Sequence, residues 1–262
     1  MSAIVMLKTS TYKDGHFMGQ AKLLFQRYEK KYLLTDSQYE QVIKAFDGKM
    51  VADEYGSYSI KNIYMDTANY DLIRTSVDGA EYKEKMRLRA YGNWDRYRND
   101  KVFLELKKKY DGIVYKRRVS MSFTDAMFYV FSGVRPKHLT DLQLSEFDFF
   151  LKRHPIVNRT FLTYDREAYA AADGGDLRIT FDRNIRYQTE GFSFDERQAA
   201  NLLPQVGVLM EIKNPLSMPL WVSRMLSKYK IRPYSFSKYG EVYKTDIIKE
   251  KNNSEVKVCS VQ

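Results

Sequence analysis

Charged residues recur at alternate positions in several segments that are otherwise apolar. In a β-strand, residues two apart lie on the same face, so each segment would carry one charged face and one apolar face. Converging arginine and lysine side chains bind phosphate groups, and interspersed carboxylates suit divalent cations. The segments with this pattern carry Arg27, Glu29 and Lys31; Arg87 and Arg89; Glu105 and Lys107; Lys116 and Arg118; Arg178, Thr180 and Asp182; and Glu211 and Lys213.

The dipeptide Asp111-Gly112 predicts how two of these segments pair, because it is typical of a two-residue hairpin turn. Counting back from the turn places Glu105 opposite Arg118 and Lys107 opposite Lys116. The first pair is favourable, whereas two directly opposed lysines destabilise a sheet. An anion bound between the lysines would remove this conflict.

The charged faces admit two interpretations. They could simply meet solvent, as in an antiparallel sheet with one wet side. Such faces usually mix neutral polar residues with charges of both signs, whereas these are dominated by Arg and Lys. If about eight strands closed into a barrel, charged faces turned inward would line a narrow lumen. Unpaired buried cations are costly, so that lumen would need a slim polyanion such as a chain of phosphates, and its glutamates could hold a divalent metal.

The elements that must position these residues are mainly strands. Segments rich in Tyr, Phe, Val and Ile predict about eight strands, with a second hairpin at 173–176. This pattern implies an antiparallel sheet or barrel. Asp66 and Asp71 are interpreted as bracketing a turn, with a metal site as the less favoured alternative. Helices with apolar residues at helical spacing are predicted over 35–46, 124–131, 140–151 and 217–228.

The chain shows no internal linker, so a single domain is predicted over 21–246. Residues 1–20 are expected to be a loose lead-in, and residues 247–262 a flexible basic tail.

The composition excludes several classes of protein. The 262 residues are 44% hydrophobic and 29% charged, which is an ordinary globular balance. The single cysteine, Cys259, excludes a disulfide framework, and His16, His138 and His154 lack metal-ligand spacing. No P-loop or Rossmann motif is present.

No apolar run reaches the roughly 18 residues of a membrane span, so we expect a cytoplasmic protein without a span. The net charge of +10 indicates an anionic partner, with nucleic acid, membrane surfaces and phosphorylated small molecules all compatible.

Eight motifs, in chain order, resemble those of a known family. They are RYEKKYLL, KMRLRAYG, VFLELKKKYDG, YKRRV, TYDREAY, LRITFD, LMEIKN and SFSKYGEVY. Together they resemble the polyphosphate polymerase domain of the vacuolar transporter chaperone (VTC) family over roughly residues 24–246. That family belongs to the triphosphate tunnel metalloenzymes of the CYTH-like superfamily. The resemblance therefore implies an α+β, mainly antiparallel fold, in which roughly eight strands close into a tunnel barrel with a charged lumen and a few peripheral helices.

The resemblance also implies roles for particular residues. Glu211 matches the family's metal-binding glutamate, and Glu29 is a second metal ligand of weaker support. The hydrolytic branch of the superfamily carries a further glutamate where this chain has Arg27, and this departure favours the polymerase branch. Arg87, Arg89, Lys107 and Lys116 are the expected catalytic residues. The expected phosphate-binding residues are Lys31, Arg87, Arg89, Lys107, Lys116, Arg166, Arg178, Lys213 and Lys238.

The implied activity is transfer of the γ-phosphoryl group of ATP to a growing polyphosphate chain, with Mn²⁺ or Mg²⁺ as cofactor. The acceptor phosphate is already ionised, which agrees with the lack of a general-base constellation. Three alternatives stay open: a triphosphatase of the same fold, a non-enzymatic module that binds polyphosphate or an inositol-phosphate-type polyanion, and a basic nucleic-acid binder. The last is disfavoured because the cations alternate on separate strands and do not cluster in one run. Nothing in the sequence indicates the oligomeric state.

Overall fold

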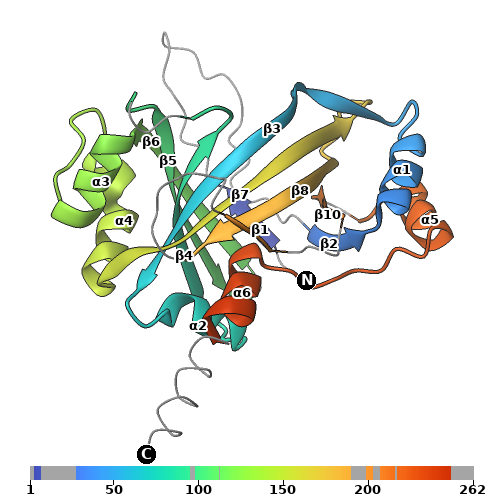
Figure 1. Ribbon diagram of the computed structural model, residues 1–262. Helices are drawn as coiled ribbons and strands as arrows, with labels where there is room; N and C mark the ends of the chain where they lie inside the picture. Colours follow the sequence, from blue (N-terminus) through green and yellow to red (C-terminus); the bar gives the residue numbers. More distant parts are fainter. Residues whose placement is uncertain are drawn as a thin grey trace, which may run out of the picture.

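A mostly antiparallel ten-stranded sheet dominates the computed structural model (Figure 1). The structure describes residues 3–6, 28–94, 98–111, 113–189, 199–202, 207–215 and 217–248. Its strands are β1 (Ala3–Met6), β2 (Tyr28–Leu34), β3 (Met50–Thr67), β4 (Lys83–Tyr91), β5 (Lys101–Tyr110), β6 (Ile113–Ser122), β7 (Ile156–Ala171), β8 (Arg178–Gln188), β9 (Ala200–Asn201) and β10 (Val208–Asn214). Its helices are α1 (Asp36–Lys44), α2 (Asp71–Val77), α3 (Phe123–Ser132), α4 (Asp141–Arg153), α5 (Leu220–Lys228) and α6 (Lys238–Val242), the last continued by a π-helical turn over Tyr243–Ile247.

The strand order is β1-β6-β5-β4-β3-β7-β8-β10-β2, with β9 paired to β8. Only the β1–β6 pair is parallel within the described ranges. The short β1 and β9 are additional to the eight longer strands that the sequence predicts. The order has two ends, β1 and β2, and no ladder joins them among the described residues, although some of their Cα atoms lie within 8 Å of each other. The mainly antiparallel α+β prediction is confirmed, and closure into a barrel stays a prediction.

The register of the β5–β6 hairpin confirms the pairing predicted from its turn. Glu105 lies opposite Arg118, and Lys107 lies opposite Lys116. Asp111 has a φ of 45°, in the left-handed region that a two-residue hairpin turn uses. The second predicted hairpin is also present, since β7 and β8 pair on either side of residues 173–176.

The four predicted helices are present. Two further helices, α2 and α6, were not predicted from the sequence. The side chain of Thr35 begins α1 with a capping box to Gln38. Helix α5 begins at Leu220, three residues later than expected, because Pro219 is held in an extended conformation at its N-cap. Helix α2 has no side-chain N-cap. Helix α6 is capped by the side chain of Ser237, but it spans only five residues and contains Gly240, which lowers its helix propensity.

Asp66 and Asp71 bracket the turn before α2, as predicted. The buried Asp66 carboxylate accepts the backbone N–H groups of Thr67, Leu72 and Ile73 and the hydroxyl of Tyr239. Burial raises the pKa of Asp66, although these four hydrogen bonds oppose the rise. The structure therefore gives this carboxylate the role of fixing the start of α2.

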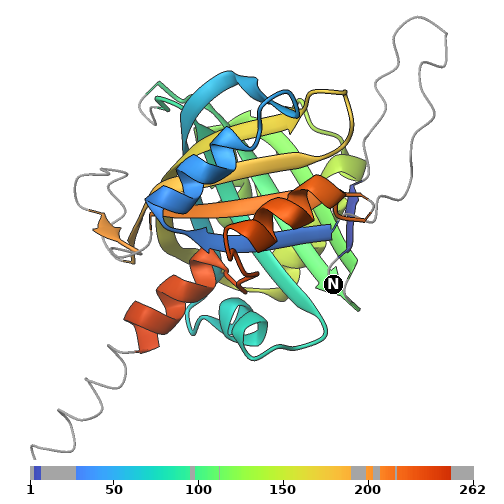
Figure 2. The same ribbon diagram turned by 90° about the vertical axis from the view of Figure 1, so that its right-hand side faces the viewer.

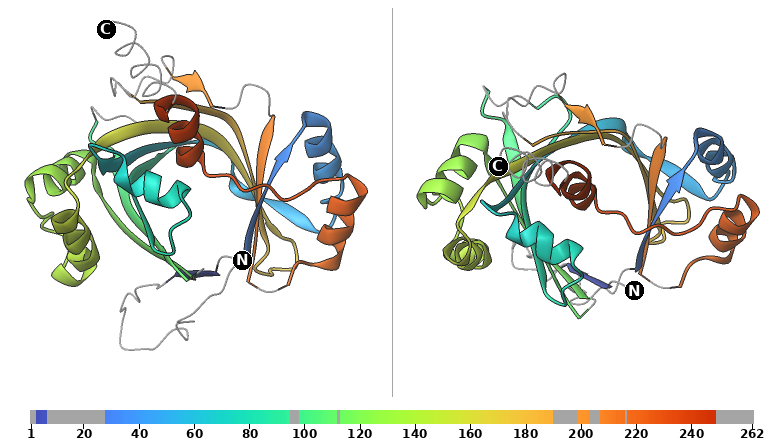
Figure 3. Two further views of the ribbon diagram at one scale, coloured as in Figure 1. Left: turned by 90° about the horizontal axis from the view of Figure 1, so that it is seen from below. Right: turned by 60° about the horizontal axis from the view of Figure 1, so that its bottom comes forward.

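The apolar faces of the strands are turned outward, beneath helices. Leu88, Leu104 and Val119 of β4, β5 and β6 pack with Phe147 and other residues of α3 and α4. On the other side, residues of β2, β8 and β10 pack with α1 and α5, which Figure 2 shows lying across these strands. Figure 3 shows the sheet curving between the two helix pairs, with α6 at its opening. Since side chains alternate along a strand, the charged faces point to the concave side.

Some predictions concern residues outside the described part of the chain. These are Arg27, His16, Cys259, the lead-in apart from Ala3–Met6, and the tail beyond Ile248. Within the described ranges, every helix is too short or too polar to cross a membrane.

Candidate functional site

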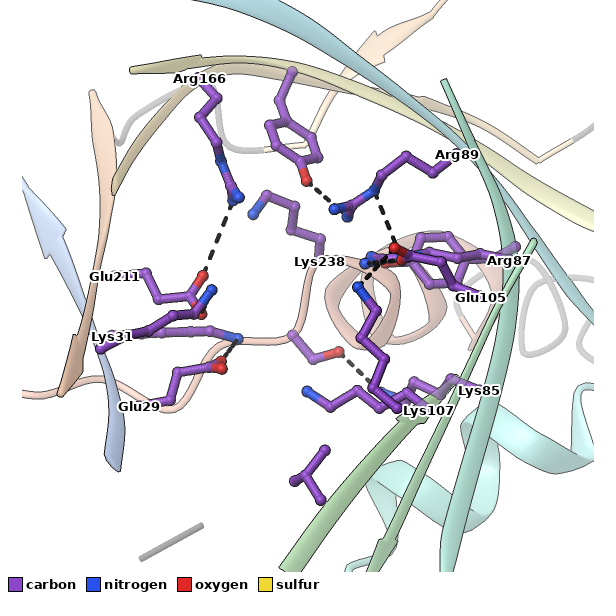
Figure 4. A pocket seen from close by; sticks show the side chains of 16 residues that line it. Glu29, Lys31, Lys85, Arg87, Arg89, Glu105, Lys107, Arg166, Glu211 and Lys238 are labelled. Carbon is purple, nitrogen blue, oxygen red and sulfur yellow. Dashed lines mark hydrogen bonds and ion pairs between the residues drawn. The ribbon is translucent and has the colours of Figure 1, made fainter. Parts of the chain in front are cut away.

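The inner face of the sheet borders a cavity of about 230 Å³. This volume lies below the ~300–1,000 Å³ of ordinary small-molecule pockets, so it suits a slim ligand. Nine basic and three acidic side chains line it, which gives it a positive electrostatic potential. Figure 4 shows these side chains converging from opposite walls. The lining residues are Glu29, Lys31, Tyr64, Lys85, Arg87, Arg89, Glu105, Lys107, Val114, Lys116, Tyr164, Arg166, Glu211, Lys213, Ser237 and Lys238.

The wall formed by β4, β5 and β6 is organised around one buried carboxylate, Glu105. Its Oε2 accepts the Nε of Arg87 at 2.8 Å, and its Oε1 accepts the Nε of Arg118 at 2.6 Å. The Nζ of Lys116 lies 2.6 Å from Oε1, and the Nε of Arg89 lies 3.9 Å from Oε2. Burial alone would raise the pKa of Glu105, but the four cations outweigh it and hold the pKa well below its usual range. Glu105 is therefore a fixed negative charge that gathers cations at the cavity.

Neutral partners complete the positioning of the two arginines. The Nη1 of Arg87 donates to the hydroxyl of Tyr64 at 2.9 Å. Arg89 donates from Nε to Oδ1 of Asn62 at 3.0 Å and from Nη2 to the hydroxyl of Tyr164 at 3.3 Å. These contacts orient the guanidinium groups without neutralising them, so both keep a positive charge for a ligand.

Three lysines on this wall have pKa values below the ordinary lysine value. Burial and the neighbouring cations, Lys107 first among them, lower the pKa of Lys85 to about 7, and its Nζ lies 3.1 Å from Oγ of Ser237. Burial likewise lowers the pKa of Lys116 to about 7, despite the adjacent Glu105. Desolvation lowers the pKa of Lys107, which forms no ion pair within 4 Å among the described residues. This part of the cavity would hold more positive charge if an anion were bound.

The facing wall, formed by β2 and β10, alternates acids and lysines. Lys31 lies 3.5 Å from Glu29, and Lys213 lies 3.0 Å from Glu211. Burial opposes ionisation of Glu211, but Lys213, Lys31 and a contact with Glu29 together keep its pKa well below the usual range. Burial also opposes the charge of Lys31, yet Glu211 and Glu29 raise its pKa overall.

Asp182 of β8 anchors two further cations at the edge of the cavity. Arg166 binds it with both Nε and Nη2, at 2.6 and 2.8 Å, and Lys238 lies 2.5 Å from its Oδ2. The ring of Tyr164 lies beneath both cations. Burial favours the neutral phenol, but Arg89, Arg166 and Lys238 lower the pKa of Tyr164 to about 8. The phenol hydroxyl is consequently a strong hydrogen-bond donor toward an anion.

The carboxylates of the cavity could hold a divalent cation only together with water and substrate phosphates. No cluster of three or more His, Cys, Asp or Glu side chains that could hold an ion occurs within the described ranges, so an all-protein cage is absent there. Mg²⁺ and similar ions commonly bind through one or two carboxylates, completed by water and substrate phosphates. Glu29 and Glu211 share one face of adjacent strands and contact each other, and like charges this close favour a bridging cation.

Ten predicted site residues gather around the cavity, and one does not. The residue outside the lining is Arg178. It lies on the same face of β8 as Asp182, but it begins that strand at an exposed end of the sheet. Its guanidinium donates to the carbonyl oxygens of Gly175 and Leu177, which explains its absence from the lining. The ten that gather are Glu29, Lys31, Arg87, Arg89, Lys107, Lys116, Arg166, Glu211, Lys213 and Lys238.

Several of the residues that line the cavity were not predicted from the sequence. Lys85 lies two positions before Arg87 on the same strand, so the alternation that indicated Arg87 and Arg89 extends to it. Tyr64 and Tyr164 are uncharged and resemble ordinary strand residues in the sequence. Ser237 approaches through the segment before α6, which no pattern in the sequence links to β4.

The fold and the site define an α+β protein whose curved antiparallel sheet carries a cation-lined cavity on its inner face. Sequence comparison then identifies the family, because the VTC domain model matches residues 26–245. The chain belongs to the VTC domain family. No curated protein sequence matches it.

Several solved structures share a distant likeness. One, described as a candidate adenylate cyclase from Bacillus halodurans, is 12% identical, with a TM-score of 0.48 over 80% of this chain and 92% of its own. Another, a candidate adenylyl cyclase from Hippeastrum described as having a dominant triphosphatase activity, is 16% identical, with a TM-score of 0.49 over 83% of this chain and 94% of its own. Both TM-scores lie below 0.5, so the likeness is weak.

Proposed function

We propose that this protein is a metal-dependent polyphosphate polymerase that transfers the γ-phosphoryl group of ATP to a growing polyphosphate chain and releases ADP. The observation that carries the proposal is the excess of positive charge in a narrow cavity, with nine basic and three acidic side chains. Membership of the VTC domain family supports the same conclusion. Phosphate groups are the ligands that such a set of guanidinium and ammonium groups binds best.

The transfer requires positioning more than proton chemistry. A terminal oxygen of polyphosphate attacks the γ-phosphorus, the bond from that phosphorus to the β,γ-bridging oxygen breaks, and the electron pair leaves with ADP. With the acceptor fully ionised, no proton has to move, so no general base is required. The main barrier is repulsion between two anions. Arg87, Arg89, Lys107 and Lys116 would reduce it by binding the equatorial and bridging oxygens in one orientation.

Glu29 and Glu211 would hold the divalent ion, which we propose to be Mn²⁺ or Mg²⁺. When bound, such an ion neutralises charge on bridging phosphate oxygens. Lys31, Lys213 and Arg166 lie beside these carboxylates, and Lys238 is paired with Asp182. All four cations would bind the remaining phosphates of the two substrates.

Four further features belong to this proposal. We propose that β1 and β2 complete a tunnel wall, which their proximity supports. We treat residues 21–246 as one domain, in line with the family match over 26–245. We propose a cytoplasmic location, which is compatible with the use of ATP. An inositol-phosphate-type polyanion is a secondary ligand of the same chemistry, whereas nucleic acid is disfavoured because a duplex is too wide for the cavity.

Incubation of the purified protein with ATP and manganese tests the proposal. We expect ADP together with long-chain polyphosphate, resolved by gel electrophoresis and by ³¹P NMR. Release of inorganic phosphate without polymer would instead identify a triphosphatase. Tight tripolyphosphate binding without turnover would identify a binding module, and either result would overturn the polymerase proposal.

A further inference from the structure

A row of aromatic side chains lies beside the cavity. We define this aromatic row as Tyr55, Tyr58, Tyr91 and Phe103. Ring centroids are separated by 6.2 Å between Tyr55 and Tyr58, 6.2 Å between Tyr58 and Tyr91, and 5.6 Å between Tyr91 and Phe103. These separations fall within the range of direct aromatic contact, so the four rings form a continuous surface.

The aromatic row continues the strand faces that line the cavity. Tyr91 follows the cavity residue Arg89 by two positions in β4, and Phe103 precedes Glu105 by two positions in β5. Tyr58 of β3 lies directly opposite Arg166 in the β3–β7 ladder. Two residues along a strand span about 6.8 Å, which one ribose can bridge. A molecule with phosphates at Arg89 and Arg166 could therefore reach the rings.

Arg118 connects the aromatic row to the cavity. Its Nε donates to Glu105 at 2.6 Å, and its Nη2 donates to the hydroxyl of Tyr91 at 2.8 Å. Its guanidinium carbon lies 4.7 Å from the ring centroid of Phe103 and 5.8 Å from that of Tyr91. A planar cation is thereby held among the rings, and arginine planes stack on nucleobases as aromatic rings do.

The exposure of the rings indicates that they serve a ligand. Tyr91 is 36% exposed, and Tyr58 and Phe103 are half-buried, so all three rings of the site are partly open to solvent, whereas rings that only fill a core are covered. A phosphate chain gains no binding free energy from contact with these rings, because the face of an aromatic ring carries negative charge density. A flat, π-rich group does gain, since each nucleobase stacks on an aromatic side chain.

We propose that Tyr58, Tyr91, Phe103 and Arg118 form a stacking site for the base of the nucleoside triphosphate whose phosphates occupy the cavity. The site distinguishes a nucleotide from inorganic tripolyphosphate, which has no group to place there. This inference rests on the proposed function, because it takes the nucleoside triphosphate as the substrate of the cavity.

Calorimetric titration with ATP and with inorganic tripolyphosphate tests the site. EDTA in the buffer prevents turnover during the titration. We expect Tyr91→Leu to weaken ATP binding about tenfold, the order expected for losing one base–aromatic stack, and to leave tripolyphosphate binding unchanged. Tyr91→Phe keeps the ring and loses the hydroxyl, so it should bind both ligands as the wild type does. Tyr110→Leu removes an exposed ring from the outer strand face and is the matched control.

Two results would overturn the stacking site. One is unchanged ATP affinity in Tyr91→Leu. The other is equal weakening of both ligands in Tyr91→Leu and Tyr91→Phe, because the tyrosine would then act only by holding Arg118.

A second readout is independent of turnover. Stacking shifts the adenine H2 and H8 proton resonances of ATP upfield on binding to the wild type, and the shift should be lost in Tyr91→Leu. Absence of the shift in the wild type, including absence of any ATP binding, also overturns the site. Failure of polymer synthesis with a normal upfield shift would refute the proposed function and leave the stacking site intact.

Discussion

The two facing walls of the cavity differ in their ratio of basic to acidic side chains. On the β4–β6 wall, a single carboxylate, Glu105, gathers Arg87, Arg89, Lys116 and Arg118, so the wall stays strongly positive. On the β2–β10 wall, carboxylates and lysines alternate one to one, so the charges nearly cancel. One wall is thus suited to bind phosphate oxygens, and the other to present carboxylates to a cation.

The difference shows that a buried carboxylate can serve two purposes. Glu105 is 2% exposed at its side chain and has no room for a metal among its four cations, so its role is to position them. Glu29, at 15% exposed, faces the cavity more openly. The same residue type therefore has different chemistry on each wall, and its neighbours decide which.

The largest expected effect tests the β4–β6 wall. Glu105→Gln leaves buried cations without their counter-charge, so we expect the free energy of unfolding to fall by about 3 kcal/mol. Urea denaturation measures this loss, and Glu29→Gln on the opposite wall should cost much less. Because the pKa of Glu105 is depressed, its contribution is present above the ordinary glutamate pKa and is lost as the pH falls below it. Equal losses for the two variants would remove the distinction between the walls.

A second variant should separate catalysis from stability on the same wall. Lys107→Ala should reduce polymer synthesis by about 10²–10³-fold, because a positioned cation next to the reacting phosphates is lost. Stability to urea should stay unchanged or rise, since the lowered pKa of Lys107 shows that its charge is disfavoured in the fold. Lys108→Ala is the control, as Lys108 pairs with Glu146 of α4 on the outer face. Normal synthesis by Lys107→Ala would contradict the role assigned to this lysine.

The β2–β10 wall is tested by its metal dependence. Glu211→Gln should raise the manganese concentration needed for half-maximal synthesis by about tenfold, a difference of about 1.4 kcal/mol in binding. Titration of activity with manganese measures the shift. Lys107→Ala should lower the maximal rate and leave the midpoint of the manganese titration unchanged. A similar midpoint shift in both variants would mean that the two walls do not divide these tasks.

The smallest expected effect concerns protons taken up on binding. With a pKa of about 7, Lys85 is mostly neutral at pH 8, and a bound polyanion should restore its charge. Tripolyphosphate binding by the wild type should therefore take up protons at pH 8 and weaken as the pH rises further above 7. Lys85→Arg, charged throughout, should take up fewer protons. Calorimetry in buffers of different ionisation enthalpy measures the difference, and identical uptake by both proteins would contradict this assignment.

Much of the site could be predicted from the sequence because strand alternation is a local property. The spacing of Arg87 and Arg89 fixes their common face, and the Asp111-Gly112 turn fixes the partners of Glu105 and Lys107. The same local rule did not show that Arg178 lies outside the cavity lining, since alternation gives the face of a residue and not its position along the strand. It also gave no indication that Tyr91 and Phe103 meet beside the cavity.

The sequence by itself determined which side chains share a strand face, where the β5–β6 hairpin turns, and where the capped helices begin, because neighbours within a few residues govern each of these features. Only the tertiary structure decided that the charged faces turn inward, since this depends on α3 and α4 covering one side of the sheet and α1 and α5 the other. It also decided that Glu105 collects four cations and that Ser237 reaches Lys85. These contacts join residues up to 152 positions apart, and the curvature of the sheet, which no local pattern specifies, brings them together.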